Sequence, residues 1–179
     1  VIGNDRNLGA VPATPSTNLT LQGTLKFSGH SSDMVLSPNR NITLTGNTTV
    51  QNSSTVNKAT IAGAITGSAN LTLTGLGLRT TLVLSGANNL SGNTTIDVGA
   101  MVVLGNVNAL GSGSLSVSTA TLDIGDYNQT VGAVTLNAPT ATGYSIGIYG
   151  SSGVLTGSSY TLTSVVGPPN NITLSANLG

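Results

Sequence analysis

Aliphatic and polar residues alternate in short runs that recur about every twenty residues between Thr81 and Thr140. Three successive segments align as TLVLSGANNLSGNTTIDVGA, MVVLGNVNALGSGSLSVSTA and TLDIGDYNQTVGAVTLNAPT. An aliphatic residue at every second position is the period of a strand with one buried face. A fixed period of this length predicts a solenoid, in which each repeat contacts only its neighbours.

Each segment is predicted to contain two inward-facing strands, joined by turns rich in glycine and asparagine. The expected core ladder combines the apolar positions of both strands: Leu82, Leu84, Ile96, Val98, Val102, Leu104, Leu115, Val117, Leu122, Ile124, Val134 and Leu136. A shorter inward contact lies between the two strands, at Leu90, Leu110 and Val131. Stacked coils would turn these strands into parallel sheets. The predicted fold class is all-β, a right-handed parallel β-helix with coils of about twenty residues and no significant helix.

The run 85–137, SGANNLSGNTTIDVGAMVVLGNVNALGSGSLSVSTATLDIGDYNQTVGAVTLN, resembles a known repeat. It is similar to the autotransporter-associated β-strand repeat of passenger regions in secreted Gram-negative surface proteins. The matching features are the LSGANN opening, the strand pair T-I-x-x-G-x-x-V-L-G, the NALGSGSL turn and the close L-D-I-G-x-Y-N-Q-T-V-G. The resemblance implies a segment of a longer passenger, with a signal peptide upstream and an outer-membrane barrel downstream.

Outside the regular coils, the pattern predicts short strands between polar turns. The first residues up to Ser16 are predicted to form a loop, because Pro12 and Pro15 break strands. Further strands are expected at 18–23, 24–27, 41–45, 48–50, 60–65, 70–74, 160–165 and 171–175. The chain 1–179 is therefore predicted to be a single β-helix segment, most regular over 81–140. Two irregular outward segments, 29–38 and 143–150, are the expected places for any binding site.

Composition excludes several classes of partner and site. Lysine and arginine number five, aspartate and glutamate together five, and the formal net charge is zero. Nucleic acids and anionic membranes select basic faces, so neither is expected as a partner, nor is membrane insertion of this segment. The chain has no cysteine, which removes disulfides and thiolate metal sites. We expect no cofactor and no metal.

Few residues offer catalytic chemistry. His30, Ser31, Ser32 and Asp33 include every residue type of a hydrolase triad, but neighbours on one loop seldom converge in the geometry that a triad needs. An ordinary surface loop is the preferred interpretation. Asp97, Asp123 and Asp126 lack the second carboxylate that glycoside hydrolysis requires. No catalytic residue is therefore predicted, and the chain is not expected to be an enzyme.

Two polar patterns remain. Asn88, Asn108 and Asn128 fall in one column at a coil corner. They predict a structural ladder in which the amides hydrogen-bond one another and the turn backbone. Threonine pairs at 43/45, 72/74 and 161/163 flank Leu44, Leu73 and Leu162, which are expected to face inward. Such pairs could form the flat threonine array of an ice-binding β-helix. Val83, Val103 and Asp123 are read as interrupting that array, so the strand propensity of threonine is the preferred explanation.

The predicted function is structural: a stiff stalk in a cell-surface or secreted bacterial protein that supports adhesion, autoaggregation or biofilm formation. One alternative is a module that binds or processes polysaccharides on the same scaffold, since a fold does not fix function. Another is a subunit of an extracellular fibre, joined through unpaired coil edges. The partners considered are surface glycans, matrix proteins or a second copy of the chain, by end-to-end or lateral association. The expected location is extracellular, at the bacterial surface.

Overall fold

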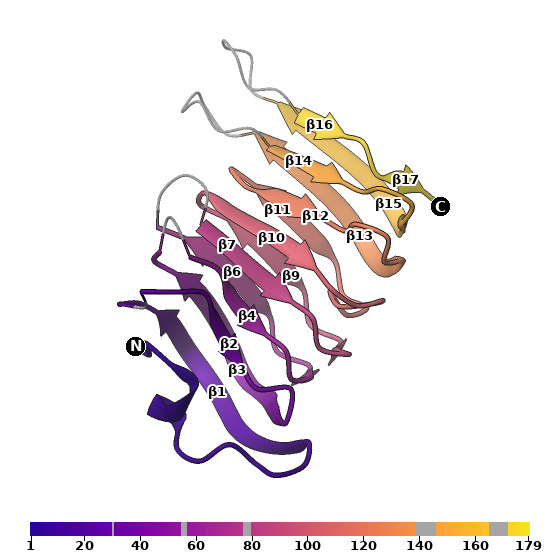
Figure 1. Ribbon diagram of the computed structural model, residues 1–179. Coiled ribbons are helices and arrows are strands. Elements are labelled where there is room, and N and C mark those ends of the chain that lie inside the picture. The colour runs from indigo at the N-terminus through magenta and orange to yellow at the C-terminus, as the bar shows by residue number, and fades with distance from the viewer. Residues whose placement is uncertain (30, 55–56, 77–79, 139–145, 165–171) are drawn as a thin grey trace.

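The chain folds as a parallel β-solenoid of about six turns. The computed structural model describes residues 1–29, 31–54, 57–76, 80–138, 146–164 and 172–179. The turns stack in sequence order, with the N-terminus at one end of the stack and the C-terminus towards the other (Figure 1). This agrees with the predicted all-β solenoid and its parallel sheets.

One wall of the solenoid is a ten-stranded sheet in which every described pairing is parallel. Its path runs β17-β15-β13-β11-β9-β6-β3-β5-β8, and β1 pairs with β3. The strands are β1 (Ser16–Phe27), β3 (Arg40–Asn52), β5 (Ile65–Gly67), β6 (Leu71–Gly75), β8 (Asn89–Leu90), β9 (Thr94–Asp97), β11 (Leu115–Ser118), β13 (Gln129–Ala138), β15 (Val154–Ser164) and β17 (Asn177–Leu178).

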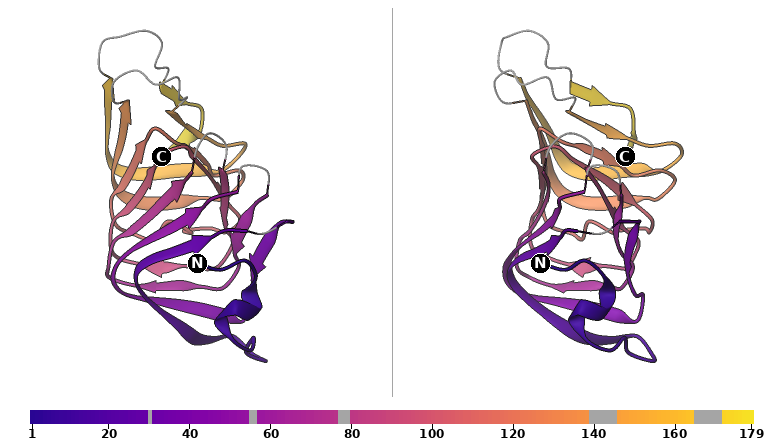
Figure 2. Two further views of the ribbon diagram at one scale, coloured as in Figure 1. Left: turned by 90° about the vertical axis from the view of Figure 1, so that its left-hand side faces the viewer. Right: turned by 60° about the vertical axis from the view of Figure 1, so that its left-hand side comes forward.

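The opposite wall is a seven-stranded parallel sheet of order β16-β14-β12-β10-β7-β4-β2. Its strands are β2 (Met34–Leu36), β4 (Ala59–Ile61), β7 (Thr80–Leu84), β10 (Ala100–Leu104), β12 (Thr121–Asp123), β14 (Ile146–Tyr149) and β16 (Ile172–Leu174). The two further views show each coil passing from one wall of the stack to the other (Figure 2). Among the described residues, no helix is long and apolar enough to cross a membrane.

Equivalent positions stack in register along the walls. Val102 pairs with Leu82 on one side and Leu122 on the other, as the sequence predicts. Coil length varies more than the predicted period, however. It is twenty residues from Leu82 to Val102 and 23 from Ile42 to Ile65, and it reaches 26 from Leu122 to Ile148.

The core is a continuous aliphatic column between the two walls. Eleven of the twelve residues of the predicted core ladder are at most 3% exposed, and Leu90, Leu110 and Val131 are buried as well. Val98 is the exception: it is 50% exposed with a φ of 48°, so its predicted inward position is wrong. Strand β11 pairs Leu115 with Thr94 and Val117 with Ile96, which makes Thr94 the missing inward residue.

Thr94 does not fit the aliphatic pattern, because its side chain is polar. Its side chain is 2% exposed, and its hydroxyl donates a 3.0 Å hydrogen bond to the carbonyl oxygen of Leu110. A buried hydroxyl is tolerated when it is hydrogen-bonded in this way. A prediction from aliphatic residues alone therefore places the inward pair at Ile96 and Val98, two residues after the observed pair, Thr94 and Ile96.

Other expectations also need correction. The N-terminal loop contains a short 3-10 helix, η1 (Asp5–Leu8), and Ile2 forms a bridge with Phe27. The segment 29–38 is less irregular than predicted, since it contains β2 with Met34 and Leu36 buried. The strand pairs expected at 18–27 and 41–50 are the single strands β1 and β3.

Leu162 stacks on an inward-facing residue but is not buried. Its side chain is 52% exposed, although its neighbour in the preceding coil, Leu136, is fully buried. Strand β17 pairs only with Val154 and Leu155 of β15, so no described strand covers the half of β15 that carries Leu162. Without that cover, the alternating pattern no longer produces burial.

Candidate functional site

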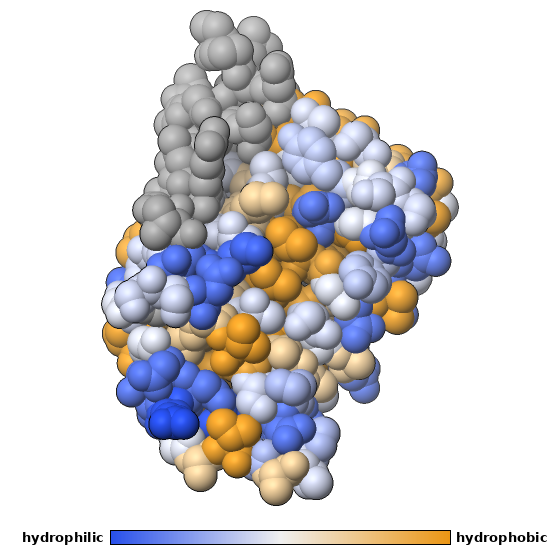
Figure 3. Space-filling view, in the orientation of Figure 1, coloured by the Kyte–Doolittle hydropathy of each residue, from blue (hydrophilic) through white to orange (hydrophobic). Residues whose placement is uncertain are grey.

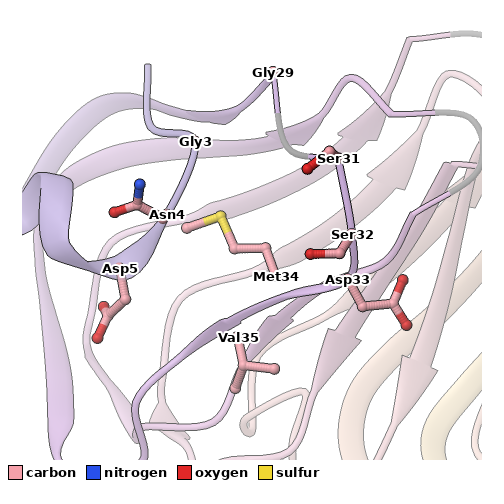
Figure 4. Close-up of a pocket in the computed structure, with 9 residues that line it drawn as sticks. All are labelled: Gly3, Asn4, Asp5, Gly29, Ser31, Ser32, Asp33, Met34 and Val35. Carbon is pink, nitrogen blue, oxygen red and sulfur yellow. The ribbon is translucent and has the colours of Figure 1, made fainter.

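A hollow of about 400 Å³ lies at the N-terminal end of the stack. It is lined by Gly3, Asn4 and Asp5 on one side and by Gly29 and the segment 31–35 on the other (Figure 4). It therefore includes three members of the triad-like cluster, Ser31, Ser32 and Asp33. The fourth, His30, lies outside the described residues.

The two carboxylates of this hollow point away from each other (Figure 4). Asp33 accepts a 2.8 Å hydrogen bond from the backbone N–H of Lys58, which ties the start of β2 to the next coil. Asp5 accepts a 2.7 Å charged hydrogen bond from Nε of Arg40. Each carboxylate is already hydrogen-bonded to another part of the chain, so the two do not form the pair of acids that glycoside hydrolysis requires.

Arg40 is the feature of this region that the sequence analysis missed. Its side chain is fully buried beneath the N-terminal segment. Besides Asp5 Oδ1, its guanidinium donates to the carbonyl oxygens of Leu8 at 3.2 Å, Gly9 at 3.1 Å and Asp5 at 3.4 Å. A buried arginine is stable only when paired and hydrogen-bonded, and here the acceptors come from η1 and from Gly9, which caps its C-terminal end. Arg40 therefore fastens η1 over the end of the solenoid.

Replacing Asp5 with asparagine should weaken the docking of η1 on the end of the solenoid. The variant leaves Arg40 without a counter-ion, but three carbonyl contacts remain, so we expect a loss of about 2 kcal/mol in the docking of η1. Limited proteolysis should then cleave within residues 1–15 more than tenfold faster. Asp33→Asn is the matched control, because an amide oxygen can still accept the N–H of Lys58. Equal cleavage of both variants would contradict the role of Arg40.

The acids of the regular coils are structural as well. Asp97 accepts hydrogen bonds from Thr119 Oγ1 and from the N–H of Val98, each at 2.7 Å. Asp123 Oδ1 accepts the N–H of Gly125, and Asp126 Oδ1 accepts both the N–H and the hydroxyl of Ser152. All three stabilise turns or join coils. In the part of the chain that the structure describes, no three His, Cys, Asp or Glu residues gather as metal ligands.

The predicted asparagine column lies at a coil corner, beside a hollow of about 300 Å³ that Asn88 and Asn108 help to line. Asn88 bridges both adjacent coils, accepting the N–H of Ile65 at 2.8 Å and donating to the carbonyl of Ala109 at 2.7 Å. Asn108 accepts the N–H of Thr130, and Asn128 that of Val154. These amides hydrogen-bond the backbone of the neighbouring coils, as predicted, whereas the predicted bonds between the three amides themselves do not form.

A second asparagine ladder, which the sequence analysis did not find, runs along the ten-stranded sheet. Asn47 Oδ1 accepts the N–H of Asn70 at 3.4 Å, Asn70 Oδ1 that of Asn93 at 3.0 Å, and Asn93 Oδ1 that of Ser114 at 3.1 Å. The first two steps each span 23 residues. A period of 23 is the signal that could have found them, since a period of twenty does not align these residues.

The threonines also stack more regularly than expected. Thr72 pairs with Thr49 on one side and Thr95 on the other, within the ten-stranded sheet. Val83, Val103 and Asp123 stack on one another in the seven-stranded sheet instead. They therefore do not interrupt the threonine column, and the reason given for dismissing an ordered array is wrong.

Comparison with known proteins gives one informative similarity. No protein-family model matches the chain, and no solved structure matches it. The chain is 29% identical over 168 residues to Adhesin BmaC autotransporter of Brucella suis biovar 1 (strain 1330). The match covers 89% of this chain but only 5% of that protein, so the chain spans a small part of its relative's length. The chain is therefore a homologue of an autotransporter adhesin, and its parallel β-solenoid agrees with the β-helical passenger that the resemblance implies.

Proposed function

We propose that the chain is part of a rigid, non-enzymatic rod on a bacterial surface that supports adhesion. The observation that carries this proposal is the similarity to an autotransporter adhesin over most of a chain that is one continuous solenoid. Stacked coils form a stiff rod because each coil is held to the next by backbone hydrogen bonds and by a common aliphatic core. All five acidic residues of the chain accept structural hydrogen bonds, which favours a supporting role over an enzymatic one.

Surface display tests the proposal. The chain is fused between a signal peptide and an outer-membrane anchor in a non-adherent bacterium, and adherence to coated surfaces and cell–cell aggregation are measured. We expect folded, protease-resistant display with increased adherence or aggregation. The matched control replaces this chain with a β-solenoid of similar length from an unrelated protein. Adherence equal to that control would overturn a role in adhesion and leave only that of a spacer.

A further inference from the structure

An unbroken column of hydroxyl side chains runs along the outer face of the ten-stranded sheet. The strand register stacks one residue from each of seven neighbouring strands: Thr24, Thr49, Thr72, Thr95, Ser116, Thr135 and Thr161. In the strands between β1 and β15, the residues on either side of each hydroxyl are buried, so the hydroxyl points outward. Neighbouring hydroxyls are separated by one strand spacing, about 4.8 Å. We call this set the hydroxyl column.

The hydroxyl column is available for binding. Within the described part of the chain, the hydroxyls of Thr49, Thr72, Thr95 and Thr135 form no hydrogen bond, and their side chains are partly exposed. Neighbouring columns on this face are also polar. One contains the asparagine ladder described above, and the other contains Gln51, Thr74, Ser118 and Asn137. The face thus presents donors and acceptors at regular intervals.

The face is also nearly free of charge. Asp97 is the acid in these columns, and its carboxylate is held by Thr119 and by the backbone of Val98. Lys26 stands at the edge, on β1. A partner that matches this face must itself be neutral, because a polyanion would find no array of cations.

The other wall has a different character. The register of the seven-stranded sheet places Val35, Thr60, Val83, Val103 and Asp123 in one column, in that order, and Met101 in the next column is 38% exposed. Figure 3 shows apolar residues in a broken line on the face turned to the viewer, among polar ones. The hydroxyl column is therefore specific to one wall and is not the general surface chemistry of the molecule.

We propose that the hydroxyl column and its flanking amides bind an extended, neutral polysaccharide aligned with the solenoid axis. The coil spacing is close to the length of one hexose in an extended β-linked chain, so successive sugars meet successive coils. A single hydrogen bond between hydroxyls contributes little, because it replaces one made to water. Affinity must therefore come from repetition along a polymer, and a single sugar should bind poorly. This inference goes beyond the proposed rod and rests on it only for placing the face outside the cell.

Co-sedimentation of the purified chain with regenerated cellulose tests the inference, with glucose and heparin as competitors. The test variant is the triple substitution Thr49→Val, Thr72→Val and Thr95→Val, which removes three hydroxyls at nearly constant shape. The matched control makes the same change on the other wall, at Thr60, Thr81 and Thr121. Circular dichroism melts establish that both variants fold.

We expect saturable binding to cellulose that changes less than twofold between low and high salt and is not displaced by glucose or heparin. The test variant should bind at least tenfold more weakly, and the control should stay within twofold of the original. Absence of binding by the folded chain, equal loss in both variants, or displacement by heparin would each overturn the inference. So would a change in the oligomeric state of the test variant in the absence of cellulose, measured by sedimentation velocity, because that would identify the face as a contact between two copies. None of these outcomes decides the proposed role in adhesion, which the surface-display experiment tests separately.

Discussion

Replacing Leu104 with aspartate is expected to abolish the cooperative folding of the solenoid. Leu104 is 3% exposed, pairs with Leu84 of the preceding coil and belongs to the continuous aliphatic column. The change removes a buried leucine side chain, which by itself costs about 2–5 kcal/mol. It also forces a carboxyl group into an apolar interior, where it must remain charged without a partner or take up a proton. The sum, about 5 kcal/mol or more, is comparable to the whole stability of a small domain.

Val103→Asp is the matched control for this prediction. Val103 lies on the same strand, one residue earlier, and its side chain is on the outer face and partly exposed. Because successive strand residues face opposite sides, the same new carboxylate remains in water there. Urea unfolding followed by circular dichroism should show a cooperative transition for the control and none for Leu104→Asp. Two variants of similar stability would contradict the assignment of the inner face.

The sequence predicts this inner face well because the signal is redundant. Leu82, Val102 and Leu122 repeat the same position in three coils, and each is flanked by residues of the opposite face. An error at any one position is corrected by the other coils. The all-β class and the parallel stacking follow from the same repetition.

The pattern fails where one inward residue is polar. Thr94 is buried through its hydrogen bond to Leu110, so an analysis that searches for aliphatic residues selects Val98 instead. Val98 belongs to a turn, where its left-handed φ of 48° places it outside the strand period. The strand register, which depends on backbone pairing across about twenty residues, contains information that no single strand's sequence supplies.

The polar columns could be predicted only in part, for a related reason. Coils of different length change the period along the chain, so alignment at twenty residues misses the asparagine ladder. The same alignment places Val83 and Val103 in the path of the threonines, whereas in space they lie on the other wall. Arg40 gives no repeating signal at all, since its acceptors lie about 31–35 residues away in a segment without periodicity.

Glycines at one coil corner hold the register that the hydroxyl column depends on. Gly92 and Gly113 occupy successive coils, after Ala69 in the coil before them, and the backbone N–H of Gly132 donates to the carbonyl of Gly113 at 2.9 Å. A Cβ on Gly113 would lie on the carbonyl oxygen of Gly92, far inside van der Waals contact. The obstacle is backbone, so no side-chain rotation can relieve it. The two coils would have to separate at this corner, and their ladder hydrogen bonds would break with it.

Gly113→Ala should therefore destabilise the chain by about 3 kcal/mol or more, at the upper end of what overpacking costs. Ser114→Ala is the matched control, because the side chain of Ser114 is exposed and its backbone N–H still donates to Asn93. Urea midpoints measure the stability of both variants, and hydrogen exchange locates the damage. Exchange should accelerate first in β9 and β11, which flank the corner, since coils in a solenoid depend on their nearest neighbours. If Gly113→Ala retained the original midpoint and exchange pattern, close stacking at this corner would not determine the register. The hydroxyls of Thr95 and Ser116 would then be held in line by the paired strands β9 and β11 alone.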